Sequence, residues 1–288
     1  MKKVKISVIV TVYNRLEYVR NIILALINQT KQIDELILAD DGSKGDIKSV
    51  IGDLINKCQF SIKHVWQEDI GFRLSRSRNN GVREATGELL VFLDQDIIFS
   101  NDFIEKIYKN CNKKRMVYTK AINSTEEERN KIQKLIKEKL NYIEIYEYTK
   151  KENSKIINKA LRKDKIYNFL YSCHLKNRGG KIAGLMFALY KEDYININGF
   201  DEKYKAYGYE DDDFGNRFFG YGGKTKPLMF LRYPIHMYHP FDNSKKHDLN
   251  KEYYYKRKNK ILKNKDFFCK YGYCNSIDTD KVKVSILK

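Results

Sequence analysis

The chain has 288 residues, of which 42% are hydrophobic and 32% charged, a balance typical of a globular protein with a substantial core. No stretch reaches the roughly 18 apolar residues that a membrane-spanning helix needs, and the first residues enter a strand pattern directly, which argues against a secretion signal. The net charge of +18 would suit an anionic partner. The lysines are spread along the chain, however, so we expect no nucleic-acid partner.

Strand and helix patterns alternate through the first part of the chain. Runs rich in β-branched residues predict strands at 5–13, 36–39 and 61–66, and helical patterns lie between them at 16–29 and 44–57. Strands that alternate with helices form a parallel sheet. The predicted fold class is therefore α/β, with a mostly parallel central sheet and flanking helices.

The polar residues that follow these strands are candidates for ligand contacts. In parallel sheets a ligand lies beyond the carboxyl ends of the strands. Residues 11–13 end the first strand, and Asp40 and Asp41 end the second. We expect both groups to meet at one edge of the sheet, together with residues 94–96 of a later strand.

The apolar run from Leu89 to Phe99 carries two carboxylates, Asp94 and Asp96. The run is typical of a buried strand, in which residues two apart point to the same face. Two neighbouring carboxylates repel each other and are costly to bury, so a divalent cation bound together with a diphosphate is the expected partner. The alternative is a turn or a helix cap, which an isolated pair of this kind more often forms.

Residues 71–81 form a loop that opens a helix and carries Arg73, Arg76 and Arg78. Guanidinium groups at a helix N-terminus can donate hydrogen bonds to phosphate oxygens. For any single arginine, a surface pair with a nearby carboxylate such as Glu84 is the commoner role. The spacing alone leaves the choice among the three open.

Residues 120–178 are rich in charge and contain neither glycine nor proline. Apolar residues recur there at three-to-four spacing, which predicts helices. We expect a helical insertion between two halves of one α/β domain. A basic amphipathic helix can lie on a membrane surface, although packing against the domain is the commoner arrangement.

Four consecutive carboxylates, Glu210 to Asp213, lie between glycines and aromatic residues. Acidic residues favour the first turn of a helix, which accounts for Asp212 and Asp213 but not for all four. A carboxylate can also take a proton from a reacting hydroxyl. Aromatic side chains suited to stacking on a sugar ring are close in sequence, namely Tyr207, Tyr209 and Phe214.

Two histidines, His236 and His239, lie three residues apart. A lone histidine is more often structural, but a pair at this spacing beside a predicted cation site is a reasonable source of ligands. Beyond Pro240 the chain is polar and basic, and simple solvation is the default role of its lysines.

Ordered motifs in the chain resemble GT-A glycosyltransferases of family 2. They are SVIVTVYNR, ILADDGS and GFRLSRSRNNGVREATGELLVFLDQDI, followed later by NGFDE and YGYEDDDFGNRFFGYGG. The longest motif and the later pair are similar to bacterial members related to galactosyltransferases and chondroitin polymerases. The resemblance implies a GT-A, Rossmann-like fold in which residues 1–119 bind the nucleotide sugar, 120–178 are the insertion, 179–243 bind the acceptor and 244–288 form a basic C-terminal extension.

The same resemblance implies roles on the donor side. Thr11 and Tyr13 would line the nucleoside pocket, and Asp40 would read the uracil ring. Arg73 would contact the diphosphate or the sugar, with either of the two later arginines as the alternative. Asp94 would touch the ribose or a metal-bound water. The full set of implied nucleotide-sugar contacts is Thr11, Tyr13, Asp40, Arg73, Asp94 and Gln95.

On the metal and acceptor side, the resemblance implies that Asp96 ligates Mn²⁺ or Mg²⁺. His239 would complete the metal shell, with His236 as the alternative. Asp211 would be the catalytic base. Glu210 and Asp212 would hold acceptor hydroxyls or orient the base. With Tyr209, whose ring can stack on a sugar, they form the expected acceptor-binding set.

The resemblance implies a metal-dependent glycosyltransferase, and the family together with the candidate base implies an inverting one. It would move a hexose or N-acetylhexosamine from a UDP-sugar, such as UDP-galactose or UDP-N-acetylgalactosamine, to a hydroxyl of a glycan or glycolipid in bacterial surface polysaccharide synthesis. The five scattered cysteines favour the cytoplasm, with peripheral contact at the inner face of the membrane. The rivals are a nucleotidyltransferase-like enzyme, although no phosphate-binding Gly-rich Lys loop is present, and a non-catalytic basic protein that binds glycan or nucleic acid.

Overall fold

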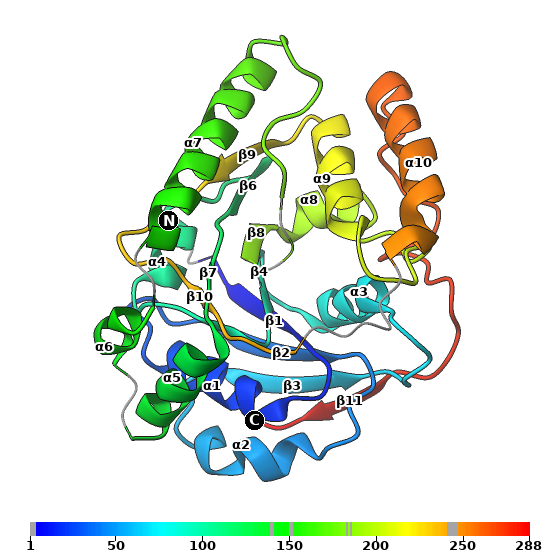
Figure 1. Ribbon diagram of the computed structural model, residues 1–288. Coiled ribbons are helices and arrows are strands. Elements are labelled where there is room, and N and C mark those ends of the chain that lie inside the picture. Colours follow the sequence, from blue (N-terminus) through cyan, green and yellow to red (C-terminus); the bar gives the residue numbers. More distant parts are fainter. Residues whose placement is uncertain (1–3, 139–140, 150–151, 183, 185, 241–246) are drawn as a thin grey trace.

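The computed structural model describes residues 4–138, 141–149, 152–182, 184, 186–240 and 247–288. An eight-stranded sheet lies at its centre, with the strand order β11-β3-β2-β1-β4-β8-β6-β9 (Figure 1). Its parallel part consists of β1 (Ile6–Val12), β2 (Glu35–Asp40), β3 (Ser61–Trp66) and β4 (Leu89–Asp94). The predicted α/β class with a mostly parallel sheet is confirmed.

Helices cover both faces of the parallel strands. α1 (Leu16–Ile27) and α2 (Ile47–Ile55) lie on one side and α3 (Leu74–Glu84) on the other (Figure 1). From β1 the sheet grows outward through β2 to β3, whereas β4 pairs with the opposite edge of β1. The strand order thus reverses between β1 and β4, the position at which parallel α/β sheets bind their ligands.

The second half of the sheet is mixed. β8 (Met186–Tyr190) runs antiparallel to β4 and is followed in the sheet by β6 (Arg115–Tyr118) and β9 (Lys224–Pro227). α4 (Phe103–Asn110) precedes β6 and α8 (Lys191–Asn196) follows β8. A stack of buried rings joins β4 and β8 to the helices beyond them, formed by Phe92, Phe187, Tyr194, Phe200 and Phe214.

A second sheet has three short strands in the order β5-β10-β7. They are β5 (Ile97–Ile98), β10 (Ile235–His236) and β7 (Ile122–Asn123). The run predicted as one strand from 89 to 99 is therefore divided, because the chain turns at Gln95 and Asp96 before β5 begins. This turn brings the segment around His236 alongside the end of β4.

Three helices fall within the segment predicted to be helical. They are α5 (Glu126–Glu138), α6 (Tyr142–Glu147) and α7 (Glu152–Ser172). The segment also contributes β7 to the small sheet. Among the described residues, none of the helices combines the length and apolar character needed to cross a bilayer.

The last third of the chain returns to the main sheet. α9 (Glu210–Gly220) packs against α10 (Lys251–Asn264), which follows the short 3₁₀ helix η1 (His247–Asn250). β11 (Lys283–Ile286) then pairs antiparallel with β3. The sequence pattern did not predict this edge strand.

Candidate active site

Asp96, His236 and His239 form a cluster at the end of β4. Each offers one ligand atom, and these atoms lie within 4.8 Å of one another. His236 Nε2 is 3.3 Å from Asp96 Oδ1, and His239 Nε2 is 3.4 Å from Asp96 Oδ2. Backbone pairing fixes the arrangement, since His236 is paired with Ile97 and the N–H of Met237 donates to the carbonyl of Asp96 at 2.8 Å.

This cluster suits a divalent cation. Burial alone would raise the pKa of Asp96, but the nearby His236 and Arg15 keep it below its usual range. Arg15 Nη2 lies 3.8 Å from Asp96 Oδ2. One carboxylate with two imidazoles is a donor set that Mn²⁺ accepts. The prediction that one histidine would serve with Asp96 stays a prediction, and the geometry offers both.

Asp94 and Asp211 share Arg78. The Arg78 guanidinium donates to Asp211 Oδ1 at 2.8 Å and to Asp94 Oδ1 at 3.4 Å, and its own side chain is only 2% exposed. Thr11, the partner of Asp94 in the β1–β4 register, donates to the same Asp94 oxygen at 2.8 Å. One arginine thus joins a carboxylate of the first half of the chain to one from α9.

Burial raises the pKa of two carboxyl groups near Arg78. It raises the pKa of Asp94 to about 6, even though the charge of Arg78 opposes the shift. Burial and the neighbouring charge of Asp211 raise the pKa of Glu210 to about 8. Perturbed carboxyl groups of this kind gather at functional sites more often than elsewhere.

Close packing holds Asp211 in place. A Cβ atom added to Gly184 would lie 2.1 Å from Asp211 Oδ2, so a larger residue at 184 would displace the carboxylate. Tyr209, which precedes α9, adopts a left-handed backbone conformation with φ 73°. Its ring lies 4.8 Å from that of Tyr254.

The remaining residues predicted to contact the nucleotide sugar lie at or just beyond the ends of β1, β2 and β4. The Tyr13 N–H donates to Gln95 Oε1 at 3.2 Å, and Gln95 Nε2 donates to the Tyr13 carbonyl at 3.0 Å. Both oxygens of Asp40 are engaged: Oδ1 accepts from the N–H of Ser43 in the following turn, and Oδ2 lies 2.8 Å from His64 Nε2 on β3. The predicted contact of Asp40 with a uracil ring stays a prediction, and a uracil would have to share these oxygens with Ser43 and His64.

Arg73 is held by the C-terminal segment. Its guanidinium binds Asp280 at 2.8 Å and Asp278 at 3.3 Å, and Arg76 binds Asp280 at 2.9 Å. A diphosphate bound to Arg73 would therefore have to compete with Asp278 and Asp280 for its guanidinium. Of the three candidate arginines, Arg78 is the one that contacts Asp94. The sequence could not reveal this, because the two aspartates are about 200 residues away.

The residues beside Asp211 divide into distinct environments. Asp212 accepts a hydrogen bond from Tyr254 and lies 3.1 Å from Arg178. Asp213 forms a fully buried pair with Arg217, as a structural role requires. Phe214 is 1% exposed and stacks on Phe200, so the expectation that it stacks on a sugar ring is wrong.

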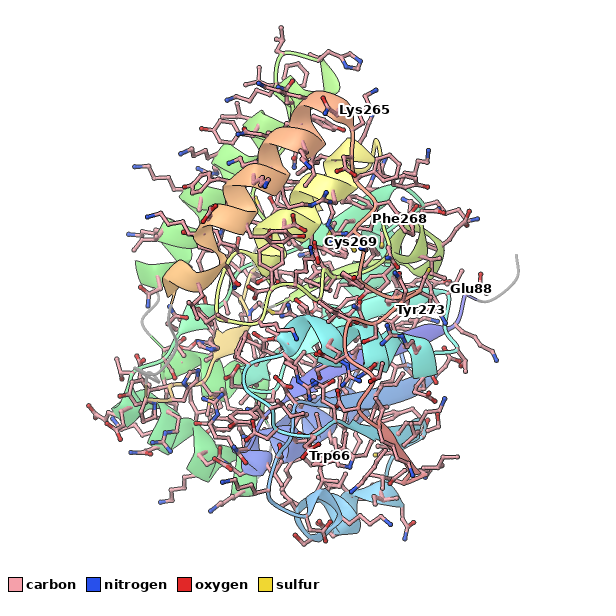
Figure 2. All side chains as sticks on the ribbon, turned by 90° about the vertical axis from the view of Figure 1, so that its right-hand side faces the viewer. Trp66, Glu88, Lys265, Phe268, Cys269 and Tyr273 are labelled. Atoms are coloured by element: carbon pink, nitrogen blue, oxygen red, sulfur yellow. The ribbon has the colours of Figure 1, made fainter. Side chains whose placement is uncertain are left out.

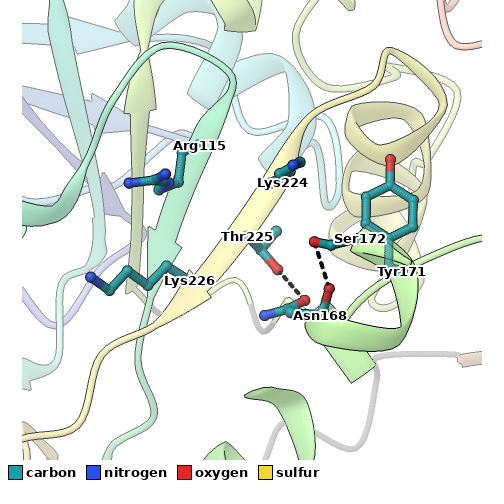
Figure 3. A pocket seen from close by; sticks show the side chains of 7 residues that line it. All are labelled: Arg115, Asn168, Tyr171, Ser172, Lys224, Thr225 and Lys226. Atoms are coloured by element: carbon teal, nitrogen blue, oxygen red, sulfur yellow. Dashed lines mark hydrogen bonds between the residues drawn. The ribbon is translucent and has the colours of Figure 1, made fainter. Parts of the chain in front are cut away.

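A hollow of about 400 Å³ lies elsewhere, between α7 and β9 (Figure 3). Thr225 on β9 and Asn168 on α7 face each other there and are joined by a 2.8 Å hydrogen bond. Its lining residues are Arg115, Asn168, Tyr171, Ser172, Lys224, Thr225 and Lys226. None of the predicted site residues lines it.

Two family models match the regions of the chain that contain these residues. A family model described as glycosyl transferase family 2 matches residues 7–192, more than half of the chain. The chain belongs to glycosyltransferase family 2. A second model, described as the N-terminal domain of galactosyltransferase, matches residues 164–240 of this family 2 protein. That match contains α9 and both histidines of the cluster.

Curated relatives share parts of the family 2 chain. Chondroitin synthase of Escherichia coli is 27% identical over 232 residues, which are 75% of this chain and 32% of that protein. Cholesterol galactosyltransferase of Borreliella burgdorferi is 36% identical over 109 residues, 38% of this chain and 30% of that protein. The chain thus spans a third or less of the length of the curated relatives it matches.

Solved structures share the fold at low sequence identity. The TarS 1–349 fragment of Staphylococcus aureus in complex with UDP-GlcNAc aligns with a TM-score of 0.58 at 14% identity, covering 94% of this chain and 68% of that one. The mannosyltransferase PcManGT of Pyrobaculum calidifontis, with GDP-Man and Mn²⁺, aligns with a TM-score of 0.53 at 14% identity, covering 82% and 58%. These similarities confirm the GT-A-like fold.

Proposed function

We propose that this family 2 protein is a metal-dependent, inverting glycosyltransferase that uses a UDP-sugar. The observation that carries the proposal is the cluster of Asp96, His236 and His239, immediately beside Asp94, which shares Arg78 with Asp211. The candidate cation ligands and the candidate base are thus linked through Asp94 and Arg78. The alternative activities, nucleotidyl transfer and simple binding, gain no comparable support.

Asp96 and the two histidines would hold the cation. When bound, Mn²⁺ or Mg²⁺ supplies positive charge to a departing diphosphate. Thr11, Tyr13 and Gln95 would position the nucleotide at the reversal between β1 and β4. Arg78 offers fixed donors at the same place, and its bonds to two carboxylates keep the guanidinium oriented.

Asp211 would act as the base. As the acceptor oxygen bonds to the anomeric carbon, Asp211 takes the hydroxyl proton and the bond from that carbon to the diphosphate breaks, releasing UDP. Glu210, with a pKa of about 8, is neutral at pH 7 and could donate a hydrogen bond to an acceptor oxygen. Attack from the side opposite the leaving group inverts the anomeric carbon.

The donor would carry a hexose or N-acetylhexosamine, and the acceptor would be a hydroxyl of a bacterial surface glycan or glycolipid. Support comes from relatives named as a chondroitin synthase and a galactosyltransferase, and from a structural neighbour bound to UDP-GlcNAc. A neighbour bound to GDP-Man makes the guanosine donors the necessary comparison in any donor screen.

Two variants test the assignment together. We expect Asp96→Ala to abolish Mn²⁺-dependent UDP binding, measured by calorimetry, because the cluster loses its only carboxylate. We expect Asp211→Asn to bind UDP nearly as well as the wild type while sugar transfer falls by a factor of about 10² to 10⁴. Unchanged UDP binding in Asp96→Ala, or retained turnover in Asp211→Asn, would contradict the respective role.

A further inference from the structure

The C-terminal end of α7 exposes large apolar side chains. Ile166 and Phe169 are 59% and 67% exposed, and Leu175, just beyond the helix, is 71% exposed. Ile166 and Phe169 are three residues apart, so they occupy the same face of the helix. We call residues 163–177 the α7 tip.

The α7 tip has a defined backbone at its end. His174 adopts a left-handed conformation with φ 59°. Its N–H donates to the carbonyl of Tyr171 at 3.0 Å, and the N–H of Leu175 donates to the carbonyl of Leu170 at 2.9 Å. This is the pair of hydrogen bonds that closes a helix in a Schellman motif. Leu175 is therefore held beside the helix end instead of lying on an unanchored loop.

Positive charge surrounds these apolar side chains. From 153 to 178 the chain has seven cations and one acid, Asp164, which is half-buried beside Tyr118. Lys163 and Lys176 lie over the ring of Tyr167, at 5.5 Å and 4.5 Å from its centre. The cations are Lys155, Lys159, Arg162, Lys163, Lys165, Lys176 and Arg178.

α10 adds further cations at the same end of the molecule. Figure 1 shows that α7 and α10 both extend to the end farthest from α2, and Figure 2 places Lys265, which caps α10, at that end. Lys263 lies in the last turn of α10. The apolar α7 tip and the end of α10 thus belong to one basic end of the protein.

We propose that the α7 tip, assisted by the end of α10, binds the surface of a membrane that contains anionic lipids. Exposed apolar side chains bordered by lysines are the features that let a helix enter the headgroup region while its cations contact lipid phosphates. A polyanionic glycan would use the lysines but not Ile166, Phe169 and Leu175. Two copies joined tip to tip would bring like charges together.

The chain's own cysteines allow a direct measurement. Cys173 lies in the α7 tip and is exposed, as is Cys274, whereas Cys58, Cys111 and Cys269 are buried. An environment-sensitive fluorophore on Cys173, in a Cys274→Ser background, should shift to shorter wavelength with vesicles of phosphatidylcholine and phosphatidylglycerol. The matched control carries the fluorophore on Cys274 with Cys173→Ser. Cys274 adjoins Tyr273, which Figure 2 places well away from Lys265, so this label should not shift.

Two further variants separate the apolar and charged contributions. Phe169→Ser with Leu175→Ser, and separately Lys163→Glu with Lys176→Glu, should each weaken vesicle binding by about tenfold or more in co-sedimentation. One control is Leu231→Ser, because the Leu231 side chain is 86% exposed but lies outside the α7 tip. The other is Lys48→Glu with Lys57→Glu, in and just after α2, at the opposite end of the molecule. Neither control should change binding.

Three results would overturn the proposal. They are no binding to the mixed vesicles, equal binding to phosphatidylcholine alone, and concentration-dependent self-association that Phe169→Ser abolishes, which would indicate a second copy as the partner. The measurements need no nucleotide, metal or acceptor. The proposal therefore stands or fails independently of the glycosyltransferase assignment.

Discussion

Glu210 illustrates how burial sets the state of a single residue in this site. Its side chain is 4% exposed, and Oε2 has no hydrogen-bond partner among the described residues. Its pKa is raised from 4.5 to about 8, so the folded protein holds a proton there that the unfolded chain releases near pH 4.5. Folding stability from this group is present below pH 4.5 and is lost as the pH rises toward 8.

We therefore expect Glu210→Gln to be more heat-stable than the wild type at high pH. Glutamine stays neutral, so the variant escapes the cost of ionising a buried acid. Its Tm should exceed that of the wild type by about 3 °C or more at pH 9, with a smaller difference at pH 5. Differential scanning calorimetry at both pH values measures this.

Glu144→Gln is the matched control, because Glu144 is exposed on α6. Its Tm difference from the wild type should not depend on pH. A Glu210→Gln difference that stayed constant from pH 5 to pH 9 would contradict the raised pKa.

At the scale of elements, the C-terminal segment 276–282 forms ion pairs with Arg73 and Arg76, at the start of α3. We call residues 71–76 the arginine loop. Asp280 binds both Arg73 and Arg76, and these arginines are each 4% exposed. The N–H of Arg73 donates to Asp41 Oδ2 at 2.9 Å, which links the same loop to the end of β2. The segment thus supports the arginine loop and the end of β2, although it is distant from both in sequence.

We expect Asp280→Asn to lower the free energy of unfolding by about 2 to 4 kcal/mol, because two buried guanidinium groups lose an anionic partner. Urea unfolding measures this change. If the loop positions the donor, KM for the nucleotide sugar should rise while kcat changes little.

Asp266→Asn provides the comparison, since Asp266 pairs with Arg257 at a more exposed position, 43% exposed. It should cost less than about 1 kcal/mol. Equal effects of the two substitutions would show that 276–282 has no special role.

The sequence predicted the elements that follow local rules. β1 to β4 and their helices were predicted because β-branched runs alternate with amphipathic ones, and Asp94 and Asp96 were noticed because carboxylates are costly in a buried run. The arginine in contact with Asp94 was not identified, since the competing Asp278 and Asp280 come from a distant segment. β11 was missed because its short, exposed sequence gives no burial pattern.

For the whole molecule, the site depends on segments that only the complete fold brings together. Thr11, Arg78, Asp96, Asp211 and His236 come from separate parts of the chain. A ligand that contacts several of them stabilises the folded state as a whole. In the proposed enzyme, a bound cation would also offset the repulsion between Asp94 and Asp96, which raises the pKa of Asp94.

We expect Mn²⁺ and UDP together to raise the Tm by about 5 °C or more at concentrations near one hundred times the dissociation constant, and each alone to have a smaller effect. Differential scanning fluorimetry with a panel of UDP- and GDP-sugars measures the shift and ranks the donors. Asp96→Ala should remove the Mn²⁺-dependent part. A larger shift with GDP than with UDP would reject uridine as the donor base.

The placement of Arg78 between Asp94 and Asp211 has a consequence for recombination between related enzymes. A chimera that joined residues 1–178 of this chain to the second half of a relative would keep the guanidinium but could lose its α9 partner. The buried Arg78 guanidinium would then pair with Asp94 only. The hybrid would fold poorly unless the helix that replaces α9 had an acidic residue at the position equivalent to Asp211. A functional hybrid of this kind therefore needs a carboxylate at the position of Asp211.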